Sequence, residues 1–265
     1  MSEYHGLFVR IDKRISRGLL FGGNYTWSAN FSDNDEPLAI SAIINSSPPV
    51  AQSYFNYRNE WSRSIFDRPL RFVVHYLYEI PTPDLVGKTA PPWKLVLGDW
   101  QVSGFFEWQS GQPFTVRTGV DSGGSGVFSA VSGWRPDLNL NGIFTKDPVE
   151  GNLRTFSTPI DGTGIFLTQL RNGLPLANSM PIGGNLGRNT LRGPSLANWN
   201  LSLAKRIPIS ESFSLQIRAD FFNLWNHRNF GNPNAVMSNF ALGTFGTNLT
   251  DPGTRTMLLA LKVFF

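Results

Sequence analysis

Residues 256–265 read Thr-Met-Leu-Leu-Ala-Leu-Lys-Val-Phe-Phe, a stretch in which polar and apolar side chains nearly alternate. One face of this extended segment carries Met257, Leu259, Leu261, Val263 and Phe265. The opposite face carries Thr256, Ala260 and Lys262, with Leu258 and Phe264 as apolar exceptions. Because successive side chains of a strand point to opposite faces, this period of two predicts a β-strand with one apolar side.

The same alternation recurs in six other stretches, which predict six more strands. Their apolar positions are Leu7, Val9 and Ile11; Leu19, Phe21, Tyr25 and Trp27; every second residue of 70–80 and of 100–108; Trp199, Leu201, Leu203 and Ile207; and every second residue of 213–221. Read as a helix, 213–222 would carry charge all round. Pro208 and the short segment 209–212 predict a hairpin between the two strands that flank them.

The connections between these strands alternate in length. Residues 15–18 and 209–212 are short and 81–99 is intermediate, whereas 31–67, 119–197 and 228–253 are long. Antiparallel strands that cross a membrane produce this alternation, with turns on one side and loops on the other. A connection as long as 119–197 is uncommon in a soluble sandwich or propeller. The expected fold is therefore all-β, an antiparallel transmembrane β-barrel whose final strand runs inward to Phe265.

Composition excludes several classes of protein. Charged residues make up 16% of the chain and aromatic residues 13%, so the surface is poor in charge for a soluble protein. Without cysteine there is no disulfide, thiolate zinc site or cysteine nucleophile. The basic residues are scattered and the net charge is only +4, which argues against a nucleic-acid partner. Residues 1–10 lack the apolar core of a signal peptide, so any export signal is expected upstream.

No motif in the chain predicts catalysis or a cofactor. His5, His75 and His227 are isolated and lack the short spacings of a metal site. The Gly-rich segments 122–126 and 183–187 are not followed by Lys-Ser/Thr, so flexible outer loops are a better interpretation than phosphate cradles. The acidic residues are dispersed. We expect no enzyme, no cofactor and no metal.

The ending of the chain resembles the terminal signature of outer-membrane barrel proteins, in which a final aromatic residue follows alternating hydrophobic residues. The resemblance implies a Gram-negative outer membrane, with the lipid bilayer and the barrel assembly machinery as partners. In that family the assembly machinery reads the last strand, here Met257, Leu259, Leu261, Val263 and Phe265. The alternative is an ordinary amphipathic strand that ends in Phe.

A second resemblance is carried by three segments: Arg188 to Pro194 (RNTLRGP), Asn198 to Lys205 (NWNLSLAK) and Leu215 to His227 (LQIRADFFNLWNH), followed by Asn229-Phe230-Gly231. They are similar to the C-terminal end of Oar-like TonB-dependent receptors, closely over the last third of the chain. One departure is Asn200, where Asp is more usual. Such receptors have a carboxypeptidase-regulatory-like domain, a plug and a barrel of about 22 strands. This sequence shows neither plug nor TonB-contacting box.

Seven strands cannot close so large a barrel, because each free edge would leave backbone groups unpaired in lipid. The expectation is that residues 1–265 form the C-terminal segment of a larger barrel, with TonB engaged through the missing N-terminal part. The resemblance implies energised uptake of an unknown small ligand or oligosaccharide. Iron chelates, cobalamin and oligosaccharides all stay open. The alternatives are an adhesion or secretion-linked barrel, or a soluble all-β carbohydrate-binding module or hydrolase.

Candidate site residues follow from the polar faces of the strands. The side chains expected to face the barrel interior are Glu107, Gln216, Arg218, Asp220 and Lys262, which could pair with one another, contact a plug or line a substrate route. Trp27, Trp108 and Trp225 lie near strand ends. They are expected at the membrane interface, the alternative being that they pack beneath loops.

Overall fold

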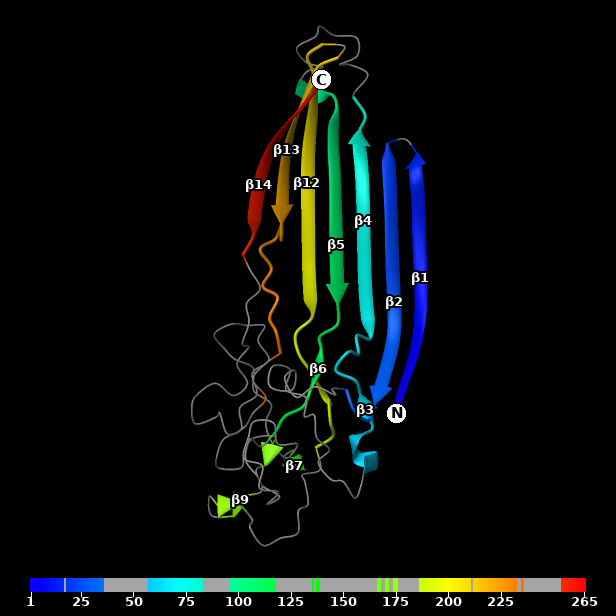
Figure 1. Ribbon diagram of the computed structural model, residues 1–265, viewed down its shortest axis with the longest axis vertical. Helices are drawn as coiled ribbons and strands as arrows, with labels where there is room; N and C mark the ends of the chain where they lie inside the picture. Colours follow the sequence, from blue (N-terminus) through cyan, green and yellow to red (C-terminus); the bar gives the residue numbers. More distant parts are fainter. Residues whose placement is uncertain are drawn as a thin grey trace.

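The computed structural model describes residues 1–16, 18–35, 57–82, 96–117, 135, 137–138, 166–167, 170–171, 174–175, 186–210, 212–232, 235 and 254–265. Seven long strands form one sheet, with every neighbouring pair antiparallel (Figure 1). In sheet order they are β1 (Ser2–Ser16), β2 (Leu19–Ser32), β4 (Leu70–Ile80), β5 (Trp100–Gln109), β12 (Leu196–Pro208), β13 (Ser214–Phe222) and β14 (Thr256–Phe264). Each long strand thus lies beside the next one along the chain.

The shorter elements are not part of this series of seven long strands. A 3-10 helix, η1 (Tyr57–Glu60), precedes β3 (Ser62–Arg63), which pairs with the end of β2. Three two-stranded ribbons join β6 (Pro113–Phe114) to β11 (Leu191–Arg192), β7 (Asp137–Leu138) to β8 (Phe166–Leu167), and β9 (Leu170–Arg171) to β10 (Leu174–Pro175). Among the described residues, no helix is long and apolar enough to span a membrane.

The cross-strand register places the apolar positions on one face of the sheet. Partners in register lie on the same side, and one such row runs through Val9, Tyr25, Phe72, Trp108 and Ala197. A second row continues it through Leu203, Ala219 and Leu259. This apolar face is open: Leu259 is 68% exposed and Leu261 64%. An exposed apolar surface across the whole sheet is stable in lipid and costly in water.

The two ends of the sheet differ in their connections. At one end, here called the turn end, β1 joins β2 through Gly18 and β12 joins β13 through residues 209–213 (Figure 1). Gly18 has a φ of 78°, a conformation that favours glycine, and its carbonyl accepts a hydrogen bond from Glu79 N–H at 2.8 Å. The last residue also lies at the turn end. The opposite end, here called the loop end, carries the connections that follow β2, β5 and β13.

The strands extend further than their hydrophobic patterns predicted. The pattern around Leu7 predicted a short first strand, whereas β1 covers fifteen residues. β2 continues to Ser32 and β12 begins at Leu196, so both enter segments that we expected to be loop. Backbone pairing to a neighbouring strand maintains the extended conformation where side-chain alternation has faded. Both Gly-rich segments lie outside the described residues except for Leu186 and Gly187 at the edge of the second.

Candidate functional site

The structure places all five candidate interior side chains on the face opposite the apolar rows. Glu107 pairs with Asn198 and Val73, Gln216 with Lys262 and Arg206, and Asp220 with Ser202. Arg218 and Asp220 lie two residues apart on β13 and therefore share this face. We call it the polar face. It brings together side chains from β4, β5, β12, β13 and β14 that sequence alone could only assign strand by strand.

Charges on the polar face pair with each other. Arg71 Nη2 donates to Glu107 Oε1 at 2.7 Å across the β4 and β5 pair, and Arg218 Nε donates to Asp220 Oδ1 at 2.7 Å. The Asp220 side chain is 9% exposed, whereas that of Arg218 is 41% exposed. Of the candidate residues, Arg218 and Asp220 contact one another, whereas Glu107 contacts Arg71. Asn200, the departure from the receptor pattern, accepts a hydrogen bond from Asn223 N–H at 3.0 Å.

Lys205 is a cation on the apolar face that the alternation did not single out. In the strand register it lies opposite Ile217 and Trp100 near the turn end, and it is only 6% exposed. Its ammonium donates to the Gly98 carbonyl and lies 5.4 Å from the centre of the Trp100 ring. A lysine near the end of a lipid-facing strand is tolerated when a carbonyl and an aromatic ring stabilise its charge at the interface.

Aromatic side chains form a band on the apolar face toward the loop end. Edge-to-face contacts join Phe72 to Phe106, Phe106 to Trp199 and Trp199 to Trp225, at centroid distances of 6.2, 6.1 and 5.9 Å. Trp27 and Trp225 are 50% and 70% exposed, so neither is packed beneath other described residues. From Trp27 to Leu19 the strand runs about 26 Å, and a tilt of 35–45° reduces this to roughly 20 Å. That height is slightly less than the apolar band of about 25 Å of an outer-membrane barrel.

At the loop end, a buried polar network ties the bases of two long connections to the sheet. Arg188 is 2% exposed and donates to Asp35 Oδ2 at 2.6 Å, to the Glu60 carbonyl at 2.9 Å, and to the carbonyl of Ser32. Its own carbonyl accepts a hydrogen bond from the Ser62 hydroxyl. One guanidinium therefore joins the end of β2, η1 and the segment that leads into β12.

Asn189 extends this network toward β6. Its backbone N–H donates to Thr115 Oγ1 at 2.8 Å, and the Thr115 hydroxyl donates back to the Asn189 side-chain oxygen at 2.9 Å. The Asn189 amide nitrogen donates to Asp35 Oδ2 and to the Arg63 carbonyl. The Ile65 N–H donates to the same Asp35 oxygen at 3.0 Å. A φ of 53° at Asn189 directs these groups inward.

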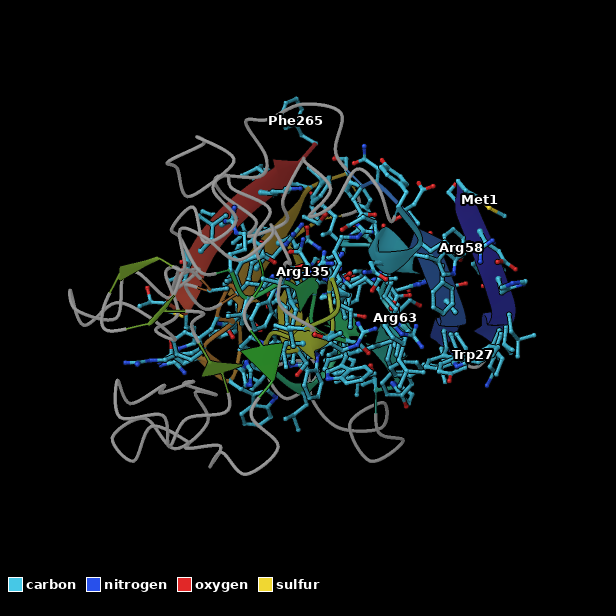
Figure 2. The ribbon with its side chains drawn as sticks, turned by 90° about the horizontal axis from the view of Figure 1, so that it is seen from below. Met1, Trp27, Arg58, Arg63, Arg135 and Phe265 are labelled. Atoms are coloured by element: carbon cyan, nitrogen blue, oxygen red, sulfur yellow. The ribbon has the colours of Figure 1, made fainter. Side chains whose placement is uncertain are left out.

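Two further carboxylates complete the loop-end network. Asp67 is fully buried and accepts from Arg192, from Arg63 Nη1 at 3.0 Å and from Asn30 N–H at 2.9 Å. Glu60, 2% exposed, accepts from Arg135 Nη1 at 2.8 Å. Figure 2 looks at the molecule from this end, with Arg63 and Arg135 labelled, and shows the strands following an open curve from β1 to β14. We define the loop-end network as Ser32, Asp35, Glu60, Asp67, Thr115, Arg135, Arg188, Asn189 and Arg192.

Arg117 lies buried beside this region, and burial lowers its pKa to about 10. Burial also lowers the pKa of the Arg68 guanidinium. A base with a folded pKa below its unfolded pKa costs stability at neutral pH, and that cost falls as the pH rises past the folded value. At neutral pH, the burial of the Arg68 and Arg117 cations at the loop end therefore costs some folding stability.

Sequence reasoning missed the loop-end network. Its partners are far apart in the chain: Arg135 and Glu60 are 75 positions apart, Arg188 and Asp35 153. Each charge stands alone in a segment of weak local pattern, so the dispersed acidic and basic residues gave no cluster to identify. The one available signal was the run from Arg188 to Pro194, which carried a family resemblance.

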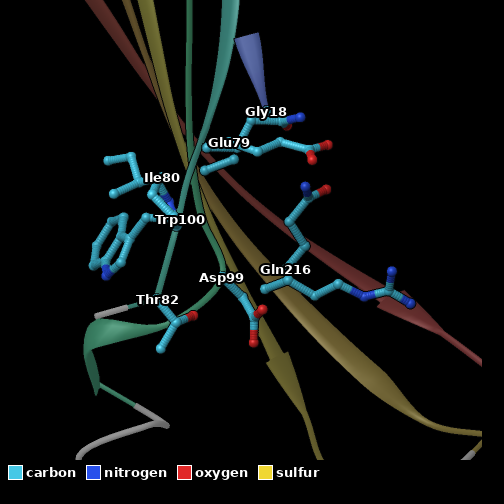
Figure 3. A pocket seen from close by; sticks show the side chains of 11 residues that line it. Gly18, Glu79, Ile80, Thr82, Asp99, Trp100 and Gln216 are labelled. Carbon is cyan, nitrogen blue, oxygen red and sulfur yellow. The ribbon is translucent and has the colours of Figure 1, made fainter. Parts of the chain in front are cut away.

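A cavity of about 570 Å³ lies at the turn end. Figure 3 shows Glu79, Asp99 and Gln216 pointing to one side of the strands, and Ile80 and Trp100 to the other. Arg206, which also lines the cavity, donates to Ser214 Oγ. His75 lies on the polar face of β4, and His5 is paired with Glu3 at 2.6 Å. Within the described ranges no group of three His, Cys, Asp or Glu side chains is placed to hold a metal.

The sequence was compared with known protein families. A family model described as an outer membrane beta barrel domain matches residues 1–257. The chain belongs to this family. It is an outer-membrane protein, and its two-faced antiparallel sheet is barrel wall, which confirms the predicted fold class and location. Membership also removes the soluble carbohydrate-binding alternative. A comparison with curated proteins gave no match.

Proposed function

We propose that the chain is the C-terminal wall of an Oar-like TonB-dependent receptor that takes up a ligand across the outer membrane. The observation that supports this is the combination of a polar face with internally paired charges and a loop end built on a buried network. An ordered base at the loop end suits connections that capture a ligand. A hydrated inner wall suits its passage.

The open edges of the sheet support a larger barrel. β1 and β14 are the edge strands of the described sheet and do not pair with each other. In lipid, unpaired edge N–H and C=O groups are costly, and further strands would satisfy them. TonB would act through parts of such a receptor outside this chain, and the barrel assembly machinery would read β14 and Phe265. We assign no catalytic role to any residue.

Uptake by cells that lack the full-length gene tests the proposal. Accumulation of labelled ferric chelates, cobalamin and oligosaccharides is compared in the deletion strain, the complemented strain and a complemented strain without TonB. We expect one nutrient to be lost on deletion and restored only where TonB is present. Unchanged accumulation of all of them, together with lost surface attachment, would instead identify an adhesion barrel.

A further inference from the structure

Two phenyl rings are exposed on the polar face at mid-height of the sheet. Phe105 on β5 is 38% exposed, and Phe222 at the end of β13 is 46% exposed. Asn200 is the cross-strand partner of Phe105, and Phe222 follows Phe221, the partner of Leu201, so Asn200 lies between the rings. Two strand spacings separate them, about 10 Å. The two rings flank one polar side chain and line one pocket, so they form a small apolar patch of the kind that contacts a ligand, unlike a single exposed ring.

A pocket of about 290 Å³ lies between these strands, near the lower size limit of small-molecule sites. Besides Phe105 and Phe222, its polar lining includes Ser103, Asn200 and Arg218. The side-chain NH₂ of Asn200 has no partner among the described residues, because only its oxygen is used by Asn223. Arg218 binds Asp220 through Nε and remains 41% exposed. The pocket therefore offers the Asn200 amide between the two rings and the Arg218 guanidinium to one side of them.

The charges that line the pocket cancel. Arg218 contributes one positive charge and Asp220 one negative charge, and the two are in contact at 2.7 Å. A strongly charged ligand would gain little from such a pair and would have to compete with it. A purely apolar ligand would bury the Asn200 and Arg218 donors without acceptors, which costs free energy for each group. A neutral ligand with many hydroxyl groups avoids both costs.

We propose that this pocket is a subsite for a neutral saccharide on the inner wall, an inference that rests on the proposed uptake function. The C–H faces of a sugar ring are apolar and stack on Phe105 and Phe222. The ring hydroxyls accept from Asn200 and Arg218 and donate to Ser103. The substrate class is thereby narrowed to uncharged oligosaccharides.

Calorimetric titration of the intact receptor in detergent tests the subsite. The probes are maltoheptaose, cellopentaose, xylopentaose and chitopentaose, with pentagalacturonate as the charged comparison. At least one neutral probe should bind, with an affinity unchanged between low and high salt. Phe222→Ala and Phe105→Ala should each weaken it by about tenfold, the effect of losing one stacked ring. Phe222→Tyr should stay within about threefold of the wild type.

Phe8→Ala is the matched control, because Phe8 is an exposed phenyl ring on the polar face of β1, away from the pocket. It should leave affinity unchanged. Phe105→Leu serves if Phe105→Ala does not fold. The subsite is refuted if no neutral probe binds, if the ring variants bind like the wild type, or if pentagalacturonate binds best. TonB-dependent uptake of a different nutrient, unaffected by the ring variants, would refute the subsite alone. Saccharide binding without any uptake would refute transport alone.

Discussion

Replacing Arg188 by Met should release the loop end without unfolding the barrel wall. The substitution replaces the aliphatic part of Arg188 with an apolar side chain and removes the guanidinium that joins Asp35, Glu60 and Ser32. Breaking a buried ion pair from one side costs about 3–5 kcal/mol, because the remaining charge is left uncompensated. Asp35 keeps donors from Ile65 and Asn189, so we expect the lower end, about 3 kcal/mol.

Amide hydrogen exchange of the folded protein measures this cost directly. About 3 kcal/mol corresponds to roughly two decades in the population of the open state. The Ile65 and Asn189 amides, which donate within the network, should lose protection by that factor. Amides in the β12 and β13 ladder should not change. Arg206→Met is the matched control: the exposed Arg206 guanidinium donates to Ser214 Oγ and lies over the Phe264 ring but joins no buried carboxylate, so its loss should change protection by less than about tenfold.

A double variant separates charge from packing. Arg188→Met with Asp35→Asn removes the unpaired buried charge while an amide still accepts hydrogen bonds, so part of the lost protection should return. Unchanged exchange at Ile65 and Asn189 in the single variant would show that the network does not hold the loop end. Equal loss in the β12 and β13 ladder would show that the network and the wall are not separable.

Two further substitutions test the faces of the sheet. Met257→Arg places a charge on the apolar face, between the levels of Trp27 and Leu19, and should destabilise the folded barrel by about 2–4 kcal/mol, seen as a lower urea midpoint in lipid, whereas Leu258→Arg on the polar face of the same strand, opposite Asp220, should have little effect. Gly104→Ala would bring its Cβ into a clash with the Tyr76 hydroxyl, which also accepts a hydrogen bond from Trp199. Displacing the Tyr76 ring should cost about 1–3 kcal/mol of folding stability. Gly23→Ala should be tolerated, because the nearest neighbours of its Cβ lie at 3.8 Å. Equal urea midpoints for the two arginine variants, or for the two glycine variants, would contradict the assignment of these positions.

The strands and their faces could be predicted because each strand carries its own signal. The period of two in Leu215, Ile217 and Ala219 can be read from one strand alone. Once lipid covers one side of the sheet, the apolar positions of every strand are assigned to that side. The consecutive strand order follows from the alternation of short and long connections. Lys205 shows the limit of this reasoning: its place on the apolar face depends on Gly98 and Trp100, which belong to another strand and its turn.

The loop-end network could not be predicted because its residues carry no local signal of this kind. Its stability comes from contacts between segments 75 to 153 positions apart in the sequence, and no repeat or spacing marks Asp35 or Glu60 beforehand. The five candidate interior residues share the face opposite the apolar rows. Their role in a substrate route stays a prediction.

The central claim is that one face of this sheet meets lipid and the other meets water. The chain has no cysteine, so single-cysteine variants along β13 report each position separately. The measurement is the labelling rate with a membrane-impermeant maleimide in the folded protein in bilayers, from Leu215 to Phe221. We predict slow labelling at Leu215, Ile217, Ala219 and Phe221 and faster labelling at Gln216 and Arg218. A profile without a period of two, or one with the opposite phase, would contradict it.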